Sequence, residues 1–252
     1  MVAPAPLTMF KGIFKLPAAH LMEVSAGGKM SFRRYWDPVP GQGIDPAEIK
    51  GLSSAELESF YTRGIRSRLE QAIEKRMMSD VPFGVFLSGG IDSSANVALM
   101  SQLMDRPVDT FTVGFKDYQH LNELEYANRI ARDFKTNHHE VLIDESDMTG
   151  YLDNLVHHQD EPIADWVCIP LYFVSKLAKD SGVTVVQVGE GSDEQFCGYD
   201  SYMTYLNLYR KFWDSYMKTP ASLRKMIGGG AELLSSPDTA FRQIQRDPVQ
   251  GR

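Results

Sequence analysis

The sequence predicts an α/β fold with a doubly wound parallel sheet, and three observations lead to this prediction. Short apolar runs alternate along the chain with segments of about 10–15 residues that have a helical apolar period. Val183–Val188 is apolar almost throughout, as in strands that are buried on both faces of a parallel sheet. Glycine-rich turns follow two of the apolar runs, at residues 88–94 and 189–191. In such sheets a ligand binds beyond the carboxyl ends of the strands, so residues after Leu87, Val113 and Val188 are expected to face one pocket.

Composition excludes several classes of function. A chain of 252 residues can bury one substantial core, or one core with an appendage. Its 33 acidic and 26 basic residues give a net charge of -7, so a nucleic-acid-binding face is not expected. The N-terminus has no basic segment before a long apolar stretch, and no apolar run reaches the length of a membrane span. We therefore expect a cytoplasmic protein that contacts neither membranes nor nucleic acid.

Cysteine and histidine spacing indicates neither a disulfide framework nor a metal centre. Cys168 and Cys197 lack the paired spacing of zinc ligands, and their number suits a reducing compartment. The adjacent pairs at 138–139 and 157–158 do not place two histidines on one helix face. We expect these histidines at strand edges or on the surface.

The first 50 residues are expected to be a lead-in segment with its own short strands. Strand-like pieces occur at Met9–Leu16 and Phe32–Trp36, without a helical period. Prolines and glycines between Pro38 and Pro46 then form a linker-like break. We place a domain boundary there, with residues 1–50 as the lead-in and residues 51–228 as the main domain.

A helix is expected to open the main domain. Ser53 and Glu56 have the spacing of a capping box. An apolar residue then recurs every four positions, which predicts a stripe that packs on the core; its members are Leu57, Tyr61, Ile65, Leu69, Ile73 and Met77.

Strands and helices then alternate to Val188. The expected strands are Val81–Leu87, Val108–Val113, His139–Ile143 and Val183–Val188. The expected helices are Ser93–Met104, Glu123–Phe134 behind an Asn122 cap, Ser146–His158 and about Pro170–Asp180. Ala127, Ile130, Ala131 and Phe134 share a face of the second of these helices, and Met148, Leu152, Leu155 and Val156 are the apolar residues of the third. Gly182 suits the C-cap of the last because it can adopt a left-handed backbone.

The turn Ser88–Ser94 has the features of an anion site. It lies between a strand and a helix, so main-chain N–H groups gather at a helix N-terminus, where positive partial charge collects. Gly89 and Gly90 allow a phosphate to approach the main chain, and Ser88, Ser93 and Ser94 carry hydroxyl donors. Asp92 would repel a bare phosphate, so pyrophosphate with Mg²⁺ is the expected ligand. The alternative is a Gly-Gly turn that only connects a strand to a helix.

A second turn, Gly189–Tyr199, carries several carboxylates after a buried strand. Each carboxylate there needs water, a partner or a cation to stay ionised. If this turn meets the first, Asp92 and Asp193 could share one or two Mg²⁺ ions, and Glu190 would remain free for acid–base chemistry. The alternative is a solvated acidic loop.

The last section, from Tyr199 to Met226, is aromatic and basic. Tyr202, Tyr205, Leu206, Tyr209, Phe212 and Trp213 have the spacing of one or two amphipathic helices. Aromatic side chains beside Arg210 and Lys211 could bind nucleic acid, but packing between helices is the favoured interpretation. Residues 229–252 are expected to be the tail of a truncated domain.

Several of these stretches together resemble one family. They are Arg76–Pro82 leading into Ser88–Ser94, then Thr112–Phe115, Asp160–Asp165, and Gly189–Glu194 with Gly198–Tyr199. This combination resembles the synthetase domain of the glutamine-hydrolysing asparagine synthetases, from about Met9 to Tyr199. The Ser-Gly-Gly turn alone is shared with other ATP pyrophosphatases of the PP-loop class, whose fold is the adenine nucleotide α-hydrolase-like sheet.

The resemblance implies a role for each matching residue. It implies that Ser88–Ser94, namely Ser88, Gly89, Gly90, Asp92, Ser93 and Ser94, binds the pyrophosphate of ATP, and that the main chain at Leu87, Val113 and Gly189 holds the adenine nucleotide. Asp92 and Asp193 match Mg²⁺ ligands, and Glu190 and Asp193 match catalytic positions. The implied reaction joins ammonia to the side-chain carboxylate of aspartate through an acyl-adenylate, with AMP and pyrophosphate as products.

The chain also departs from the family pattern. Family members begin with a cysteine-led glutaminase domain, and residues 1–50 resemble only its end, so we expect ammonia to come from a glutaminase domain outside this chain. Val188 stands where Ser is common, and Cys197 where Gly is common. We expect the chain to be part of a longer protein. Three alternatives stay open: another carboxylate acceptor, a nucleotide-binding fragment without turnover, and a scaffold that has lost ATP binding. A homodimer also stays open.

Overall fold

A computed structural model describes residues 3–37, 43–163, 165–220 and 223–224. It divides the chain into two compact units, Met1–Gly189 and Glu190–Arg252, which are described separately below. The expected boundaries at residues 50 and 228 stay predictions. Among the described residues, no helix combines the length and the hydropathy that crossing a bilayer requires.

The first unit begins with an antiparallel ribbon of two strands, β1 (His20–Val24) and β2 (Met30–Arg34). The strand expected at Phe32–Trp36 is therefore present, but it begins earlier. The strand expected at Met9–Leu16 is wrong, because Thr8 binds the carbonyl oxygens of Phe10 and Ile13 at 3.0 and 2.8 Å and folds this stretch into a turn. Only an isolated bridge from Leu7 to Phe14 has strand pairing there.

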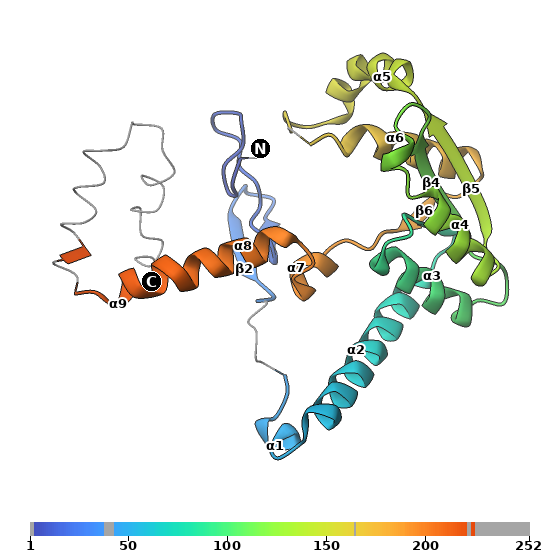
Figure 1. The fold of residues 1–252 in the computed structure, drawn as a ribbon. Coiled ribbons are helices and arrows are strands. Elements are labelled where there is room, and N and C mark those ends of the chain that lie inside the picture. Colours follow the sequence, from blue (N-terminus) through green and yellow to red (C-terminus); the bar gives the residue numbers. More distant parts are fainter. Residues whose placement is uncertain (1–2, 38–42, 164, 221–222, 225–252) are drawn as a thin grey trace. The chain divides into compact units, whose positions relative to one another are not determined.

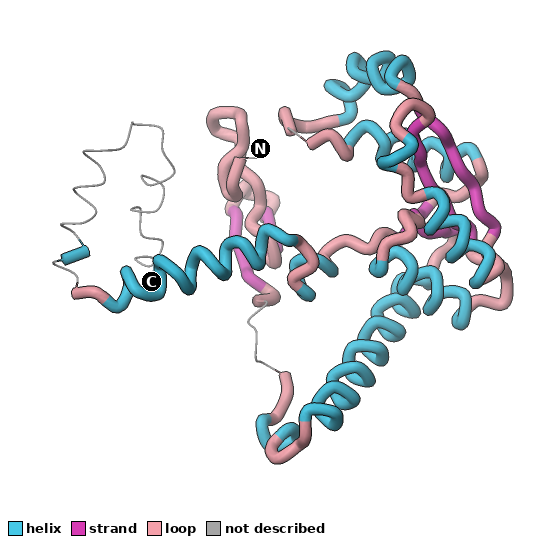
Figure 2. Tube along the Cα trace, viewed as in Figure 1, coloured by secondary structure: helices cyan, strands magenta, loops and turns pink. Residues whose placement is uncertain are grey.

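A four-stranded parallel sheet forms the centre of the first unit (Figures 1 and 2). Its strands are β3 (Phe83–Phe86), β4 (Asp109–Phe115), β5 (Asn137–Ile143) and β6 (Val185–Gln187), in the order β5-β4-β3-β6. Val85 pairs with Thr110 on one side and with Gln187 on the other, so β3 is a central strand. Each parallel pair needs a crossover, and helices supply them.

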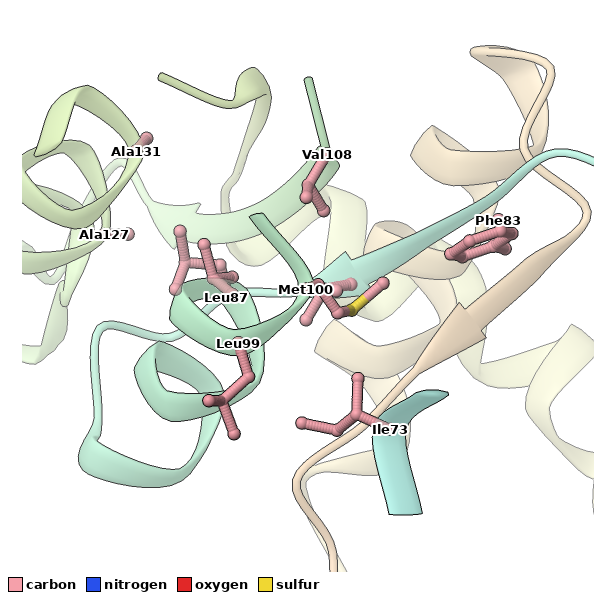
Figure 3. Packing of buried hydrophobic residues seen from close by; sticks show 10 residues of the cluster. Ile73, Phe83, Leu87, Leu99, Met100, Val108, Ala127 and Ala131 are labelled. Carbon is pink, nitrogen blue, oxygen red and sulfur yellow. The ribbon is translucent and has the colours of Figure 1, made fainter. Parts of the chain in front are cut away.

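Helices lie on both faces of this sheet. They are α2 (Ser54–Met77), α3 (Ile91–Leu103), α4 (Leu124–Asp133), α5 (Glu145–His158) and α6 (Cys168–Asp180). The short helix α1 (Pro46–Ile49) precedes α2 and buries no residue, and a 3₁₀ turn η1 (Gln119–Leu121) lies between β4 and α4. Val85 and Leu87 belong to a core with residues of α2, α3 and α4 (Figure 3). Phe111 belongs to a second core with Val174 and Ala178 of α6. The doubly wound α/β fold is therefore confirmed.

The start of α2 is as predicted, but its apolar stripe is only partly right. Ser53 and Glu56 form the capping box in both directions. Ile73 is buried and Leu69 and Met77 pack beside it, whereas Tyr61 and Ile65 are each 40% exposed. Residues four apart advance about 40° more than one helical turn, so a stripe of this spacing winds around the helix. Only its C-terminal half faces the core of this unit.

The expected face of α4 is confirmed, but its expected cap is wrong. Ala127 and Ala131 are buried, and Ile130 and Phe134 pack against the same core. Asn122 does not cap this helix. Its amide instead accepts from the N–H of Phe115 at 2.6 Å and donates to the carbonyl oxygen of Phe115 at 2.8 Å, which secures the end of β4.

The two helices on the other face differ in how well the pattern predicted them. The helix α5 is present as predicted, but two of its apolar residues, Leu152 and Val156, are 46% and 75% exposed. Tyr151 is buried instead, and its ring stacks on that of Tyr172 from α6, with centroids 3.9 Å apart. The end of α6 is as predicted: Gly182 has φ +82° and its N–H donates to the carbonyl oxygen of Lys179.

The last strand is shorter than the apolar run that predicted it. Only Val185–Gln187 pairs with β3, and the run is not buried on both faces, because Val185 and Val188 are 40% and 44% exposed. In the part of the chain that the structure describes, β6 is an edge strand, which accounts for this exposure.

The second unit is helical. It contains α7 (Ser192–Phe196) and then one helical run made of α8 (Asp200–Leu208), the π-helical turn η2 (Tyr209–Trp213) and α9 (Asp214–Lys218). The helices expected after Tyr199 are thus confirmed as helices. Tyr205, Tyr209 and Phe212 are exposed among the described residues of this unit. The expected tail at 229–252 lies outside the described residues.

Candidate functional site

The predicted anion site is a tight turn between β3 and α3. Gly89 has φ +84°, and a Cβ there would lie 2.5 Å from Cβ of Tyr126 and 2.8 Å from the main-chain nitrogen of Ala127. The turn therefore rests directly on α4, and this contact needs a residue without a side chain. No prediction from the sequence included Tyr126, because only the fold brings α4 to this turn.

Serine hydroxyls hold the turn in shape. Oγ of Ser93 accepts from the N–H of Ser88 at 3.2 Å and lies 3.0 Å from Oγ of Ser88. The N–H of Gly90 donates to Oγ of Ser88 at 3.3 Å. Two of the three serines expected to donate to a ligand thus have partners within the turn. Oγ of Ser94 is buried and has no hydrogen-bond partner among the described residues.

The N-terminus of α3 presents its main chain at this turn. Gly90 is the N-cap, and in the described chain no side chain caps the helix there. The geometry of an α-helix leaves its first N–H groups without acceptors in the helix itself. The partial positive charge of these groups favours an anion at this position.

Hydrogen bonds hold the end of β3, just before the turn, against the neighbouring strand β4. Leu87 is buried, its N–H donates to the carbonyl oxygen of Phe111 at 2.9 Å, and its own carbonyl oxygen accepts from the hydroxyl of Thr112. That carbonyl oxygen keeps a second lone pair. Val113 lies in β4, where it pairs with Val141 of β5 and packs beside the second core.

The second glycine-rich turn begins beside the first. A Cβ on Gly189 would lie 3.0 Å from Cβ of Asp92 and 3.4 Å from the main-chain nitrogen of Ser93. The end of β6 therefore touches the first turn of α3. Gly189, the first residue of the second turn, therefore lies at the same edge of the sheet as the first turn, as expected.

The remaining residues of the second turn belong to the second unit. Glu190 and Glu194 are exposed and Asp193 is half-buried. Because Asp92 and Asp193 lie in different units, their predicted proximity stays a prediction. Among the described residues, no group of three or more His, Cys, Asp or Glu side chains gathers as a metal centre.

Local contacts order the acidic turn. The N–H of Gly198 donates to the carbonyl oxygen of Asp193 at 3.0 Å. The hydroxyl of Tyr199 lies 3.5 Å from Oε1 of Glu194, and the negative charge of Glu194, followed by burial and the charge of Asp193, raises the pKa of Tyr199. The contact of Tyr199 with Glu194 depends on the turn at Cys197, so no sequence pattern predicted it.

A separate cavity lies between α5 and α6. It has a volume of about 710 Å³, and Tyr151, His158, Cys168 and Tyr172 are among its lining residues. None of the predicted site residues lines it. Within the first unit it is therefore distinct from the turn at 88–94.

Comparison with known proteins identifies the family. The family model described as asparagine synthase matches residues 64–249. A putative glutamine-hydrolysing asparagine synthetase 2 of Methanocaldococcus jannaschii is 34% identical over 222 residues, which are 88% of this chain and 40% of that protein. The glutamine-hydrolysing asparagine synthetase 1 of Bacillus subtilis is 32% identical over 224 residues, 89% of this chain and 32% of that protein.

This chain thus spans between about a third and two fifths of the length of these relatives. Among solved structures, the NH3-dependent NAD synthetase from Campylobacter jejuni in complex with the nitrate ion is 20% identical, with a TM-score of 0.36, over 54% of this chain and 60% of that one. The match to the family model covers most of the sequence, and the curated relatives match nearly all of it. The chain therefore belongs to the asparagine synthase family.

Proposed function

We propose that residues 51–228 form an ATP-dependent amide synthetase domain that joins ammonia to the side-chain carboxylate of aspartate. Membership of the asparagine synthase family supports this proposal. The observation that carries it is the contact between Gly189 and Asp92, since it brings the start of the second glycine-rich turn to the N-terminus of α3.

In this proposal the turn at 88–94 holds the pyrophosphate part of ATP. Gly89 and Gly90 expose main chain to the phosphates, and the first turn of α3 adds N–H donors. Ser88 and Ser93 act by shaping the turn, in agreement with their hydrogen bonds to each other. Ser94 is the hydroxyl left to bind a ligand or water, because its buried Oγ has no partner among the described residues.

The chemistry of the residues present fits a Mg²⁺ ion bound together with ATP. Mg²⁺ prefers oxygen ligands and is held in many ATP sites by one or two carboxylates together with phosphates and water. Asp92 and Asp193 would supply such carboxylates, so a cluster of three acidic side chains is not required. When bound, the ion would neutralise charge on the leaving pyrophosphate.

The proposed reaction has two steps. In the first, a carboxylate oxygen of aspartate bonds to the α-phosphorus of ATP while the bond from that phosphorus to the bridging oxygen breaks, which releases pyrophosphate. In the second, the nitrogen of ammonia bonds to the acyl carbon and AMP leaves. In the first step the N–H groups near Gly89 and Gly90 stabilise charge on the leaving pyrophosphate, and in the second step Glu190 takes a proton from the attacking nitrogen.

The nitrogen source lies outside this chain in the proposal. The relatives in Methanocaldococcus jannaschii and Bacillus subtilis are named as glutamine-hydrolysing enzymes. We propose that a glutaminase domain supplies ammonia and that residues 1–50 are the end of that domain. Ammonium added to the solution should then replace glutamine.

A product assay with labelled substrate tests the proposal. The chain is incubated with ATP, Mg²⁺, ammonium and aspartate that carries ¹⁸O in its side-chain carboxylate. We expect AMP, pyrophosphate and asparagine in equal amounts, with one ¹⁸O atom transferred to AMP. Formation of ADP and phosphate, or of AMP without ¹⁸O, would contradict the acyl-adenylate step.

Three matched substitutions assign the roles. Asp92→Asn and Asp193→Asn should raise the Mg²⁺ concentration needed for half-maximal AMP formation. Glu190→Gln should slow amide formation more than ATP–pyrophosphate exchange, because it acts in the second step only. Binding of ATP without turnover in the unsubstituted chain would favour the alternative of a nucleotide-binding fragment.

A second acceptor remains a candidate, because some relatives are named amidases and not asparagine synthetases. The amidase chyE of Penicillium rubens is 28% identical over 208 residues and covers 77% of this chain. The assay is therefore repeated with a panel of carboxylic acids in place of aspartate. If another acid has a larger kcat/KM than aspartate, that acid is the acceptor, and the two proposed steps stay the same.

A further inference from the structure

Gly198 lies against the side chain of Asp193. A Cβ on Gly198 would overlap Oδ1 of Asp193 and lie 2.9 Å from its Cγ and 3.2 Å from its Cα. The carboxylate therefore occupies the space that any side chain at residue 198 would fill.

The backbone of the second unit explains this contact. The short helix α7 ends at Cys197, whose φ of +57° and ψ of 44° are left-handed. This reversal brings the N–H of Gly198 within 3.0 Å of the carbonyl oxygen of Asp193, five residues earlier. The hydrogen bond and the bare Cα of Gly198 together form one wall beside the carboxylate.

We propose that Gly198 is a positioning residue, which orients the Asp193 carboxylate for a divalent cation bound with ATP. This inference rests on the proposed function, which makes Asp193 a ligand of that cation. A carboxylate confined to one orientation loses less conformational freedom when it binds a cation, and groups that orient a metal ligand contribute to metal affinity.

Metal binding by Gly198→Ala tests the inference. Mn²⁺ serves as the probe, and electron paramagnetic resonance counts free Mn²⁺ in the presence of an ATP analogue with a methylene bridge between the α and β phosphates. We expect the dissociation constant of Mn²⁺ to rise by about tenfold to a hundredfold, as for other losses of groups that orient a metal ligand. Affinity for the analogue without metal should stay unchanged, because the turn at 88–94 is intact.

A double substitution separates this role from a general structural one. If Gly198 acts through the carboxylate, Gly198→Ala should not weaken Mn²⁺ binding further in a chain that already carries Asp193→Asn. Gly150→Ala is the matched control, since a Cβ there meets no atom within 4 Å, and it should leave Mn²⁺ binding unchanged. Equal loss with and without Asp193→Asn would overturn the inference.

A folding measurement covers the case in which Gly198→Ala alone unfolds the second unit. Asp193→Ala removes the side chain that the new Cβ would overlap, so Asp193→Ala with Gly198→Ala should show the circular dichroism of Asp193→Ala alone. If this double variant unfolds while Asp193→Ala folds, the inference is overturned.

Failure of the proposed function gives a different result. In that case the unsubstituted chain takes up no Mn²⁺ with the analogue, and the inference falls with the function. If the unsubstituted chain binds Mn²⁺ and Gly198→Ala binds it equally well, only the inference falls.

Discussion

Gly89 meets two constraints that only glycine satisfies together. Its φ is +84°, a left-handed backbone, and its missing Cβ leaves room for Tyr126 and Ala127 of α4. Gly182 has nearly the same φ, +82°, but a Cβ there would meet nothing within 4 Å. Comparing substitutions at Gly89 and Gly182 therefore distinguishes the free-energy cost of a left-handed backbone from the cost of a steric overlap with α4.

We predict that Gly89→Ala destabilises the chain more than Gly182→Ala. The backbone cost should be about 1 kcal/mol at either position. The overlap with α4 should add about 1–3 kcal/mol at Gly89 alone. Urea unfolding of the two variants, followed by circular dichroism, measures the difference. Equal loss of unfolding free energy would show that the turn and α4 separate readily.

At Cys197 the backbone is left-handed in a residue that carries a side chain. We predict that Cys197→Gly stabilises the turn after α7 by about 1 kcal/mol, because glycine adopts this conformation without steric cost. Hydrogen exchange at the amide of Gly198 should slow by about fivefold. Cys197→Ala keeps the Cβ and is the control, which should exchange as the unsubstituted chain does.

At the scale of elements, polar contacts join the end of β4 to the start of α5. Asp144 caps α5 and also accepts from the ammonium of Lys116 at 2.9 Å. The hydrogen bond from Lys116, then those from Ser146 and the N–H of Asp147, hold the pKa of Asp144 well below its usual range. The contact between Lys116 and Asp144 could not be predicted from a local pattern, because the two residues meet only when β4 pairs with β5.

The lowered pKa of Asp144 predicts acid-dependent stability. The unfolded chain binds a proton at Asp144 at higher pH than the folded chain does, so this contribution is present above about pH 4 and is lost as the pH falls toward the folded pKa. Lys116→Met should lower the unfolding free energy at pH 7 and do so less at about pH 2.

Urea unfolding between these two pH values measures the change. Lys176→Met is the control, because it removes an exposed pair with Asp180 within α6 and should have little effect at either pH. A Lys116→Met defect that does not depend on pH would mean that packing of the lysine chain, and not its charge, secures α5.

At the scale of the whole molecule, the proposed chemistry requires the carboxylates of two turns to act on one cation. The strands β4, β5 and β6 lie between Asp92 and Asp193 along the chain, and the two residues belong to different units. We predict that Asp92→Asn and Asp193→Asn are not additive in their effect on the Mg²⁺ requirement for AMP formation. Residues that share a ligand couple, whereas distant residues add. If the effects of the two substitutions on the Mg²⁺ requirement add, the two carboxylates do not bind the same cation.

The fold was predictable wherever a local pattern sufficed. Alternating apolar runs and amphipathic segments predicted all four strands of the sheet and most helix bounds to within a few residues. The errors concern which side of a helix is buried, because an apolar period does not show which neighbouring element covers that side. The stripe of α2 reaches the core only from Leu69 onward, and Tyr61 and Ile65 before it are exposed. In α5 the buried residue is Tyr151, whose ring stacks on that of Tyr172 from α6.

The candidate site divides in the same way. The sequence by itself determined the family, the two glycine-rich turns and the residue types that can bind phosphate and Mg²⁺, because these are properties of short stretches. Only the tertiary structure decided that Gly89 rests on α4, that Ser88 and Ser93 bind each other, and that Gly189 touches Asp92. The physical reason is that these contacts join residues that strand pairing and helix packing bring together, and no local pattern records which elements will be neighbours.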